Sequence, residues 1–404
     1  MSFDEERDFL ATQRSTLITQ YDFDKNFDEI NNSFYRKKIL VIGGAGSIGS
    51  SFIYEVFSFS PDELHIVDIN ENGLTNLVRN LRSKNSKISN TKLKTSPLDF
   101  GSKIFELFTK ENGPYDYVFN FAAIKHVRSE KDVYSLFQMF DTNVIKHSNL
   151  LNFLDSNQLT KNYFSVSTDK AANPVSLMGA SKKIMELILN GEHYDSKINI
   201  NTSTTRFANV AFSNGSLLQS FTTRFLKKEP LVSPKNIKRY FVSHKEAAQI
   251  CILSGALLSN GQILIPKILN SFKIYPIEDV ATNFVLNKGF TPIKLKNKNE
   301  AYKVLNKNNN EYPIVITEPD TSGEKDYEEF IGKNEKLISS NFKNFDVVNN
   351  EISKINELKN FINDLNSTLN GDLEVSKADL IEKVKNLVNN FNHIDTGKNL
   401  DNRM

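Results

Sequence analysis

Three consecutive residues near the middle of the chain could move protons: Thr168, Asp169 and Lys170 bring a hydroxyl, a carboxyl and an amine together. They follow a short apolar run, which places them at the end of a predicted strand, where doubly wound sheets carry their reactive groups. Eight residues after Lys170, Met178 begins a predicted helix, and Lys182 shares one face of that helix with it at the i, i+4 spacing. Burial and neighbouring charges adjust how readily such side chains transfer protons. The segment therefore predicts a site for acid–base chemistry.

A glycine-rich loop between a predicted buried strand and a predicted helix is typical of a dinucleotide site. Gly43, Gly46 and Gly49 fit the spacing G-x-x-G-x-x-G, which permits a tight turn and a close approach of the backbone to a pyrophosphate. Asp68 ends the next strand, 19 residues after Gly49. A carboxylate there accepts hydrogen bonds from the adenosine ribose and repels a 2′-phosphate, so the motif predicts NAD rather than NADP. Asp99, at the end of the third strand, is either an adenine contact or a simple strand cap.

These residues are positioned by short apolar strands that alternate with helical patterns, which indicates a parallel sheet covered on both faces. We therefore expect an α/β fold: a Rossmann-type doubly wound parallel sheet, a smaller α/β substrate-binding part, and helical N- and C-terminal appendages. The expected boundaries are 1–37 for the N-terminal extension, 38–215 for the NAD-binding domain, 216–335 for the substrate-binding part, some of whose segments return to the main sheet, and 336–404 for the C-terminal appendage.

The C-terminal appendage has the pattern of two helices. Apolar residues from Ile352 to Leu369 recur mostly at spacings of three and four, and Gly371 interrupts the run. Ser376 and Asp379 then resemble a capping box at the start of a second helix. We expect the two helices to form an antiparallel pair.

Composition excludes several other classes of protein. The 404 residues include 50 basic and 48 acidic side chains in mixed order, so the chain lacks the charge of a dedicated nucleic-acid-binding protein. A single cysteine, Cys251, rules out an internal disulfide and a metal site built from cysteines. No apolar run approaches the ~18 residues of a membrane span, and the acidic N-terminus lacks a secretory pattern. We therefore expect a cytoplasmic protein with no nucleic-acid partner and no metal.

Segments along the chain resemble the extended short-chain dehydrogenase/reductases, and more closely their bacterial UDP-N-acetylglucosamine 4,6-dehydratase branch, the polysaccharide-biosynthesis family. The resemblance covers about residues 38–332, in the family's order. The matching segments are GGAGSIGS, AAIKHVRSEKD, TNV, STDKAANPVSLMGASK, TTRFANVAFSNGS, KRYFVSHKEA and TSGEKDYEEF. The resemblance implies a lyase with tightly bound NAD that is regenerated in each turnover. The sugar is oxidised at C4, loses the C5 proton and the C6 hydroxyl, and is reduced at C6.

The resemblance also assigns roles to the reactive residues. It implies that Asp169 is the acid at the C6 hydroxyl and that Lys170, as a neutral amine, is the base at C5. Thr168 would hydrogen-bond the 4-hydroxyl and help to relay its proton, and Lys182 would hold the nicotinamide ribose. The implied cofactor-binding residues are Gly43, Gly46, Ser47, Ile48, Gly49, Asp68, Asp99, Ala122 and Lys182.

Met178 departs from most short-chain dehydrogenases, which carry Tyr at this place in the motif Y-x-x-x-K. Tyr is the general base for the sugar hydroxyl, and methionine cannot take that role. The departure fits either an inactive homologue or a subset of the dehydratases that carries Met, is active and retains the configuration at C5. We expect an active enzyme of that subset. The group that removes the 4-hydroxyl proton stays open between Asp169, Lys170 and a water held by Thr168.

Substrate contacts are expected on the loops around this site. The resemblance implies that Lys125 orients the substrate, and His126 beside it is either a packing residue or part of the site. Asn209 is expected to contact the nucleotide diphosphate, although Ala208 replaces the family's usual Gly.

Four further side chains complete the expected substrate site. Ser213 begins a segment whose N–H groups could bind phosphate, and Arg239 could clamp the diphosphate. Glu324 resembles the family's carboxylate near the nucleotide ribose. Asn173 could reach the nicotinamide or the substrate amide.

The favoured activity is dehydration of UDP-GlcNAc in the synthesis of surface-glycan sugars, and other activities remain open. The same dehydration could act on a GDP-linked sugar, the fold could carry a 4-epimerase or oxidoreductase, or the chain could be a non-catalytic nucleotide-binding homologue. An epimerase needs no acid at C6 and normally keeps Tyr, so the T-D-K segment with Met178 favours the dehydratase. We also expect a homo-oligomer, with the terminal helical pieces as packing or oligomer elements. Larger family members carry membrane spans before the catalytic domain, and this chain resembles the soluble type.

Overall fold

The computed structural model describes residues 3–84, 90–126, 130, 132–190, 198–268, 273–307, 310–318, 328–349, 354–371 and 376–393. Within these residues the main sheet has nine strands in the order β14-β15-β10-β6-β5-β4-β1-β2-β3. They are β1 (Lys38–Ile42), β2 (Glu63–Val67), β3 (Lys92–Ser96), β4 (Tyr117–Asn120), β5 (Asn162–Val166), β6 (Asn201–Thr205), β10 (Gln262–Pro266), β14 (Lys336–Ile338) and β15 (Phe345–Asn349).

The strands from β3 to β10 are parallel, and the strand order reverses between β1 and β4. Strand β1 shows why both faces need a cover. Its Ile39 and Val41 pack into one hydrophobic core, whereas Leu40 and Ile42 pack into another on the opposite face. Such strands, apolar on both sides, are characteristic of parallel sheets covered by helices. The predicted Rossmann-type doubly wound sheet is confirmed.

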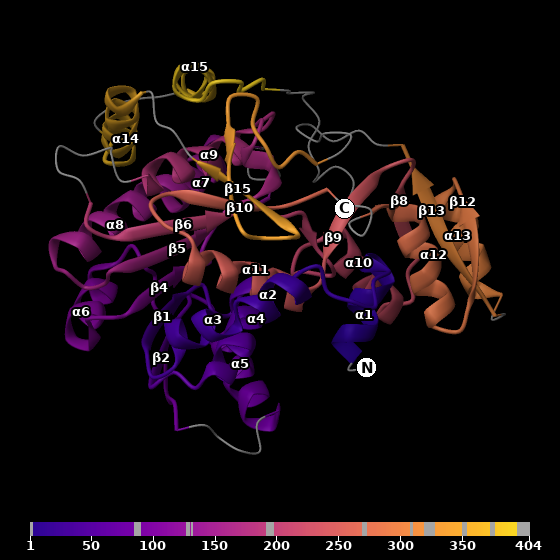
Figure 1. The fold of residues 1–404 in the computed structure, drawn as a ribbon. Coiled ribbons are helices and arrows are strands. Elements are labelled where there is room, and N and C mark those ends of the chain that lie inside the picture. The colour runs from indigo at the N-terminus through magenta and orange to yellow at the C-terminus, as the bar shows by residue number, and fades with distance from the viewer. Residues whose placement is uncertain are drawn as a thin grey trace.

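Helices cover both faces of this sheet (Figure 1). On one face lie α3 (Phe27–Phe34), α4 (Ser47–Val56) with the short turn η1 (Phe57–Phe59), α5 (Glu71–Lys84) and α11 (His244–Leu257). On the other lie α6 (Lys103–Asn112), α7 (Val133–Phe140), the π-helical turn η3 (Asp141–Ile145), α8 (Lys146–Ser156) and α9 (Leu177–Leu189). Helix α9 follows the turn η4 (Asp169–Ala171), which carries two of the predicted catalytic residues.

A smaller α/β part lies beside the carboxyl ends of the main strands, at the right in Figure 1. It contains two three-stranded sheets, β11-β9-β7 and β12-β13-β8. Their strands are β7 (Asn209–Val210), β8 (Leu231–Pro234), β9 (Lys238–Val242), β11 (Ile274–Pro276), β12 (Thr291–Leu295) and β13 (Glu311–Thr317). The helices of this part are α10 (Leu217–Leu226), α12 (Ile277–Asn287) and α13 (Lys298–Asn306). This is the part that the sequence assigned to the substrate.

The N-terminal segment forms α1 (Phe3–Thr12), α2 (Gln20–Lys25) and α3, and polar contacts fix it to both parts of the molecule. The Arg14 guanidinium donates to both oxygens of Glu246 in α11, at 3.2 and 2.5 Å, and to the Phe241 carbonyl of β9 in the smaller part at 2.9 Å. Asp22 accepts hydrogen bonds from the N–H groups of Lys343 and Asn344, just before β15. The segment is thus built into the fold.

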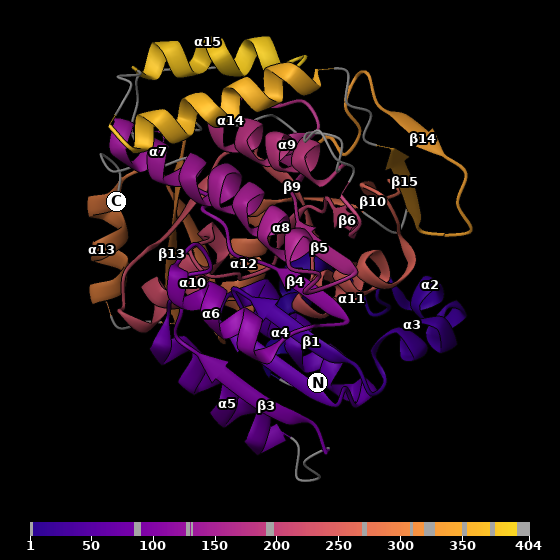
Figure 2. The ribbon, with the colours of Figure 1, turned by 90° about the vertical axis from the view of Figure 1, so that its left-hand side faces the viewer.

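The prediction that the chain is helical from residue 336 onward is wrong for its first part. Strands β14 and β15 extend the main sheet, and β15 runs antiparallel to β10. Phe345 and Val347 alternate into the core, which is a strand period. Helices α14 (Ile355–Leu369) and α15 (Lys377–Leu387) then lie outside α7 and α9 (Figure 2). The predicted capping box of Ser376 and Asp379 is present at the start of α15.

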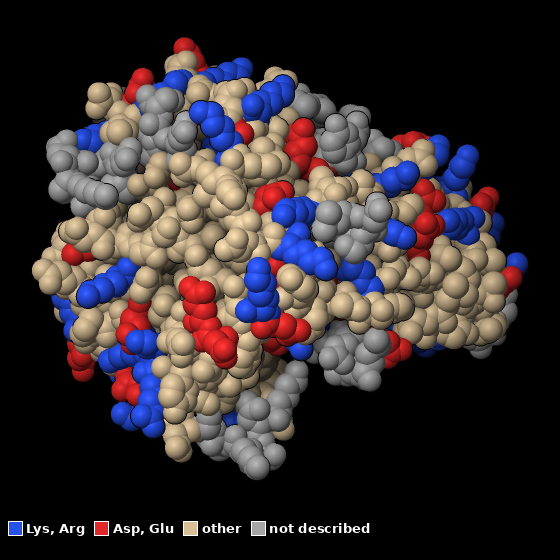
Figure 3. Space-filling view, viewed as in Figure 1, with Lys and Arg blue, Asp and Glu red and all other residues tan. Residues whose placement is uncertain are grey.

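The surface agrees with the near-neutral charge of the sequence. On the face seen in Figure 3, Lys and Arg side chains are interspersed with Asp and Glu. Among the described residues, no helix has the length and apolar composition needed to cross a membrane. The same residues contain no cluster of three His, Cys, Asp or Glu side chains able to hold a metal ion.

Candidate active site

The glycine loop lies at the carboxyl end of β1, where the strand order reverses and doubly wound sheets bind their ligands. Gly43 has φ +76°, and a Cβ atom on it would lie 2.6 Å from the Ala122 nitrogen at the end of β4. A Cβ atom on Gly49 would lie 2.3 Å from the Gly43 carbonyl oxygen. Side chains at these two positions would therefore force the loop away from β4 and α4 away from the loop.

This packing presents the N-terminus of α4 to the space above the sheet. Gly46 is the N-cap residue and has no side chain to cover the first N–H groups of the helix, which belong to Ser47, Ile48 and Gly49. Such N–H groups bind the oxygens of a phosphate, and the helix dipole favours a negative charge. The predicted pyrophosphate-binding residues are thus arranged around one helix end.

Asp68 is held in place by the backbone of the same loop. Its Oδ2 accepts the Ala45 N–H at 2.9 Å, and its Oδ1 accepts the Asn70 N–H at 2.9 Å. Each carboxylate oxygen has a second lone pair with which it can accept a ribose hydroxyl. The carboxylate is therefore fixed at the end of β2, as the predicted ribose contact requires.

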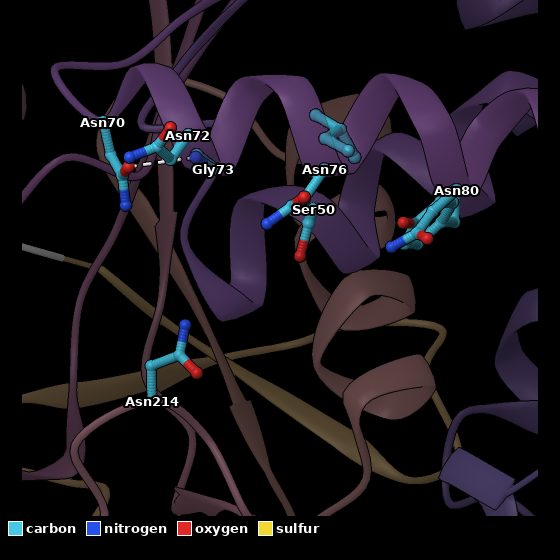
Figure 4. Close-up of a pocket in the computed structure, with 10 residues that line it drawn as sticks. Ser50, Asn70, Asn72, Gly73, Asn76, Asn80 and Asn214 are labelled. Carbon is cyan, nitrogen blue, oxygen red and sulfur yellow. Dashed lines mark hydrogen bonds between the residues drawn. The ribbon is translucent and has the colours of Figure 1, made fainter.

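A pocket of about 320 Å³ adjoins Asp68 between α4, α5 and the loop that follows β7. Figure 4 shows Asn70, Asn72 and Asn76 along α5 and its entry, with Asn214 across the pocket. The described residues that line it include neither Lys nor Arg. Neutral amides suit the hydroxyls of a ribose, whereas a 2′-phosphate would need a cation. The lining favours NAD, as the sequence predicts.

Asp99 caps the turn after β3. It accepts the Gly101 N–H at 2.9 Å and forms an ion pair with Lys146 at 2.7 Å. Burial alone would raise the pKa of Asp99, but the hydrogen bonds from Lys146 and Gly101 outweigh it and lower the pKa. The structure therefore shows the capping role, and the adenine contact remains a prediction.

The residues Thr168, Asp169 and Lys170 are brought together at the carboxyl end of β5. Thr168 is the N-cap of η4, and its hydroxyl donates to Asp169 Oδ1 at 2.8 Å. The Lys170 Nζ atom lies 3.6 Å from the same oxygen. Asp169 is buried, whereas Thr168 and Lys170 are half-buried. The hydroxyl and the amine thus converge on one carboxylate oxygen at the edge of the site.

Helix α9 lies directly against this cluster. A Cβ atom on Gly179 would lie 2.5 Å from the Lys170 carbonyl oxygen, so the helix can approach this closely only with glycine there. The preceding residue, Met178, is buried, and its N–H donates to Glu130 at 3.0 Å. One turn further on, the Lys182 ammonium donates to the Val166 carbonyl at 2.8 Å, and burial lowers its pKa to about 8 although Glu186 opposes this.

The loop after β4 adds a second amine and an imidazole. Lys125 lies at the rim of the site, where desolvation and the charge of Lys170 lower its pKa. The His126 ring packs over Gly215, so that a Cβ atom there would lie 2.8 Å from the ring. His126 therefore packs against the loop that carries Ser213, and the Asn214 N–H donates to Ser47 at 2.8 Å. The two loops close over the N-terminus of α4.

Asn173 forms hydrogen bonds with the segment at residues 329–333. Its amide donates to Glu329 at 3.2 Å and accepts the Lys333 N–H at 3.0 Å, so it holds the segment that follows residue 327. The expected contact with the nicotinamide or the substrate amide stays a prediction. Glu324, the expected carboxylate near the nucleotide ribose, lies outside the described residues.

Asn209 and Arg239, the two expected diphosphate contacts, share one buried carboxylate that sequence reasoning missed. Glu328 Oε1 accepts the Asn209 amide at 2.6 Å and lies 3.6 Å from Arg239 Nε. Glu328 belongs to the segment TSGEKDYEEF, which was quoted for its resemblance, but the carboxylate singled out there was Glu324. Choosing among four acidic residues in such a segment requires knowing which one faces inward.

Sequence reasoning also missed a buried ion network of Arg206, Glu186 and Glu335 next to the site. Arg206, fully buried after β6, donates to Glu186 of α9 at 2.7 and 2.6 Å and to Glu335 at 2.6 Å. Glu186 also accepts the Ser167 hydroxyl at 2.6 Å. The network joins the ends of β5 and β6 to α9, and thus supports the cluster at residues 168–170.

The glycine loop, the anchored Asp68 and the reactive cluster at the end of β5 define a protein of the extended short-chain dehydrogenase/reductase class. The family described as "Polysaccharide biosynthesis protein" matches residues 39–350, and the chain belongs to this family. Among solved structures, Pen from Bacillus thuringiensis has the same fold, with a TM-score of 0.62 at 21% identity over 82% of this chain and 98% of that one. The enzyme WbmF from Bordetella bronchiseptica, solved with NAD+ and UDP, gives 0.50 at 18% identity over 63% and 78%.

Three curated relatives extend the comparison. The "Uncharacterized membrane protein MJ1061" of Methanocaldococcus jannaschii is 32% identical over 66% of this chain and 77% of its own length. The probable polysaccharide biosynthesis protein EpsC of Bacillus subtilis is 29% identical over 76% of this chain but 47% of its own, so this chain spans about half of that relative. The inverting UDP-N-acetylglucosamine 4,6-dehydratase of Campylobacter jejuni is 25% identical over 58% of this chain and 68% of its own length.

Proposed function

We propose that the protein is an NAD-dependent nucleotide-sugar 4,6-dehydratase that converts UDP-GlcNAc to UDP-4-keto-6-deoxy-GlcNAc with retention at C5. The observation that carries the proposal is the cluster of Thr168, Asp169 and Lys170 on one side of the space above the glycine loop. A hydroxyl, a carboxyl and an amine meet the need of this reaction for a relay, an acid and a base. An epimerase would use no acid at C6.

The residues present fit NAD. The glycine loop is a cradle that Cβ atoms at Gly43 and Gly49 would fill, and Asp68 is oriented by the loop that would hold the pyrophosphate. The holding residues would be Gly43, Gly46, Ser47, Ile48, Gly49, Asp68, Asp99, Ala122 and Lys182. When bound, NAD supplies hydride chemistry at C4 and C6 of the sugar.

Thr168 and Asp169 give the 4-hydroxyl proton a route that does not need tyrosine. The Thr168 hydroxyl already donates to Asp169 Oδ1, so it can pass its proton to the carboxylate as it accepts the proton of the sugar. Asp169 then carries the proton that the C6 hydroxyl needs to leave as water. One proton thus moves from O4 to the departing O6, and Asp169 returns to its starting state.

Lys170 acts at C5. As a neutral amine it removes the C5 proton, which the 4-ketone has made acidic, and it returns a proton to the same face once C6 has been reduced. The C5 proton is therefore balanced within the cycle and the configuration is retained. Lys125 lies near enough to feel this amine, since desolvation and then the charge of Lys170 lower the pKa of Lys125.

Diphosphate binding is the proposed role of Asn209, Arg239 and the segment that begins at Ser213. The Asn209 amide and the Arg239 guanidinium are held next to each other by Glu328. Arg239 can bind phosphate oxygens with two N–H groups at once. The diphosphate would thus extend from the reactive cluster toward the smaller α/β part.

Met178→Leu is expected to change both stability and rate little. If the 4-hydroxyl proton leaves through Thr168 and Asp169, Met178 acts only as an apolar neighbour of the sugar, and leucine has nearly the same volume. The expected cost is less than ~1.5 kcal/mol in the free energy of unfolding, measured by denaturant titration. Met178→Tyr is expected not to raise turnover, because the buried site must expand for a ring.

The role of Lys170 in both proton transfers at C5 predicts the stereochemistry of the product. NMR of the product formed in deuterated buffer is expected to show the D configuration at C5. A higher turnover for Met178→Tyr would contradict the relay through Thr168 and Asp169, and an L-arabino product would contradict retention at C5.

A further inference from the structure

Glu130, in the loop after β4, makes a contact with α9 that the proposed reaction does not explain. Its Oε1 accepts the N–H of Met178 at 3.0 Å, and its side chain is 11% exposed. Met178 is the second residue of α9, so this N–H has no partner within the helix. The Ser176 Oγ, at the N-cap, accepts the N–H of Gly179 at 3.2 Å. A second acceptor, supplied from another part of the chain, thus completes the first turn of α9.

The first turn of α9 borders the reactive cluster. Gly179 packs against the Lys170 carbonyl oxygen, from which an added Cβ atom would lie only 2.5 Å away. A carboxylate suits the N-terminus of a helix, where the helix dipole favours negative charge. Met178 is 3% exposed, so without an acceptor its N–H would become a costly unpaired donor, and the turn would have to shift. Any such shift would move the backbone of Lys170, the proposed base.

Contacts from the C-terminal part of the chain hold Glu130 in this position. His393 Nε2 lies 3.5 Å from Glu130 Oε2, the oxygen that does not accept from Met178, and the His393 side chain is 7% exposed. Lys377, the first residue of α15, donates to the Glu130 carbonyl at 3.4 Å. A protonated imidazole forms an ion pair with the carboxylate, and a neutral one can donate a hydrogen bond through the same nitrogen. The start of α15 and the segment after it thus converge on Glu130.

The same C-terminal segment contacts the stretch that joins the reactive cluster to α9. The Asn392 N–H donates to the Pro174 carbonyl at 3.1 Å. Phe391 beside it is buried in the core that lies under α7, α8 and α9, and Leu380 of α15 belongs to the same core (Figure 2). Apolar side chains therefore fix the segment in place, so that its polar contacts can fix the loops.

We propose that Glu130 is a positioning residue that fixes the first turn of α9 beside Lys170, and that the C-terminal segment at residues 388–393 fixes Glu130. The effect on catalysis rests on the proposed function of Lys170. Glu130 transfers no proton in this role: one carboxylate oxygen accepts the Met178 N–H and the other faces His393. The C-terminal helices thereby contribute to the rate through the loop after β4 and through α9.

The first test compares kcat and KM for UDP-GlcNAc in the NAD-loaded protein. Glu130→Leu should lower kcat about tenfold and leave KM within about twofold, because it displaces the turn beside Lys170 but not the residues proposed to bind the diphosphate. Glu130→Gln keeps an oxygen that can accept the Met178 N–H, and should restore kcat to within about threefold of the wild type. Glu382→Leu, which replaces an exposed glutamate of α15, is the control and should keep the wild-type kcat.

His393→Ala removes the support while it leaves Glu130 in place, so it tests the inference even where Glu130→Leu fails to fold. It should lower kcat about threefold, and the double variant with Glu130→Leu should be no slower than Glu130→Leu alone, because both changes act through the same contact. A wild-type kcat in His393→Ala, or independent effects that multiply in the double variant, would contradict the support by the C-terminal segment.

Hydrogen exchange of the Met178 amide needs no substrate and therefore separates this inference from the proposed function. Exchange should be about tenfold faster than in the wild type in Glu130→Leu, about threefold faster in His393→Ala, and unchanged in Glu382→Leu. If no nucleotide sugar is dehydrated but the exchange rises in this way, the fixing of α9 by Glu130 stands and the proposed function fails. If dehydration occurs but the exchange is unchanged, the positioning role is wrong. It is also wrong if Glu130→Leu keeps the wild-type kcat or raises KM instead, or if Glu130→Gln is as slow as Glu130→Leu.

Discussion

Asp169→Asn and Lys170→Met are each expected to lower the turnover of UDP-GlcNAc by at least ~10²-fold, the usual scale for losing an acid or a base. Asparagine cannot carry a proton from Thr168 to the C6 hydroxyl, and methionine cannot remove the C5 proton. Neither residue contacts the glycine loop in the proposed arrangement, so both variants should fold and keep their NAD. Turnover is measured by mass spectrometry of the sugar, and NAD by its release on denaturation.

Lys161→Met is the matched control, because this lysine is exposed at the opposite end of the strand that leads to Thr168. It should keep wild-type turnover. A near-normal rate for either site variant would remove that residue from the mechanism. Exchange of the C5 hydrogen with deuterated solvent should also be lost in Lys170→Met, which identifies proton abstraction as the missing step.

Gly49→Ala is expected to abolish the binding of NAD, with about a tenth or less of the wild-type cofactor recovered from the purified protein. The added Cβ atom would lie 2.3 Å from the Gly43 carbonyl oxygen, so α4 must move away from the loop and its first N–H groups lose their position. Wild-type protein should release near-stoichiometric cofactor without a 2′-phosphate, because NAD stays bound through each turnover. The cofactor is quantified after denaturation of the purified protein.

Ser51→Ala, in the same helix, is the control for this variant. Ser51 bonds the Ser47 carbonyl of its own helix, so its loss should leave the loop and the bound NAD unchanged. Asp68→Asn introduces no steric clash and should weaken NAD binding only through the lost ribose contact. Weaker binding in this variant therefore cannot be attributed to misfolding, unlike the loss expected in Gly49→Ala. Recovery of NADP, or full NAD occupancy in Gly49→Ala, would contradict the assignment of the loop.

The elements that the sequence predicts well are those specified by local patterns. Three of these local patterns occur within 31 residues: the buried strand β1, the glycines at 43, 46 and 49, and the carboxylate of Asp68. Burial in the sheet, the tight turn and the expected ribose contact, respectively, account for these residue types. The capping box at Ser376 is equally local, since residues three apart satisfy each other. Such signals need no knowledge of distant segments.

The features that the sequence did not predict depend on contacts between distant residues. Strand β15 pairs with the edge of β10, and β14 pairs with β15; these strands of five and three residues are too short for a distinct sequence pattern. Glu328 is buried only because Asn209 and Tyr240, about 90 to 120 residues earlier in the chain, enclose it. Asn173 is similarly engaged by residues 329–333. Boundaries between the parts of the chain and the predicted homo-oligomer stay predictions.

The proposed 4,6-dehydratase activity is tested most directly by incubating the purified protein with UDP-GlcNAc without added NAD. The mass of the nucleotide sugar is then measured by mass spectrometry. A 4,6-dehydratase that regenerates its cofactor should convert the sugar to a product that has lost one water, over many turnovers per protein molecule. A 4-epimerase on the same fold would leave the mass unchanged, and an oxidoreductase would stop after one turnover without added cofactor. Loss of one water in the wild type, together with its absence in Asp169→Asn, is the predicted result; a sugar of unchanged mass in the NAD-loaded wild type would contradict the account.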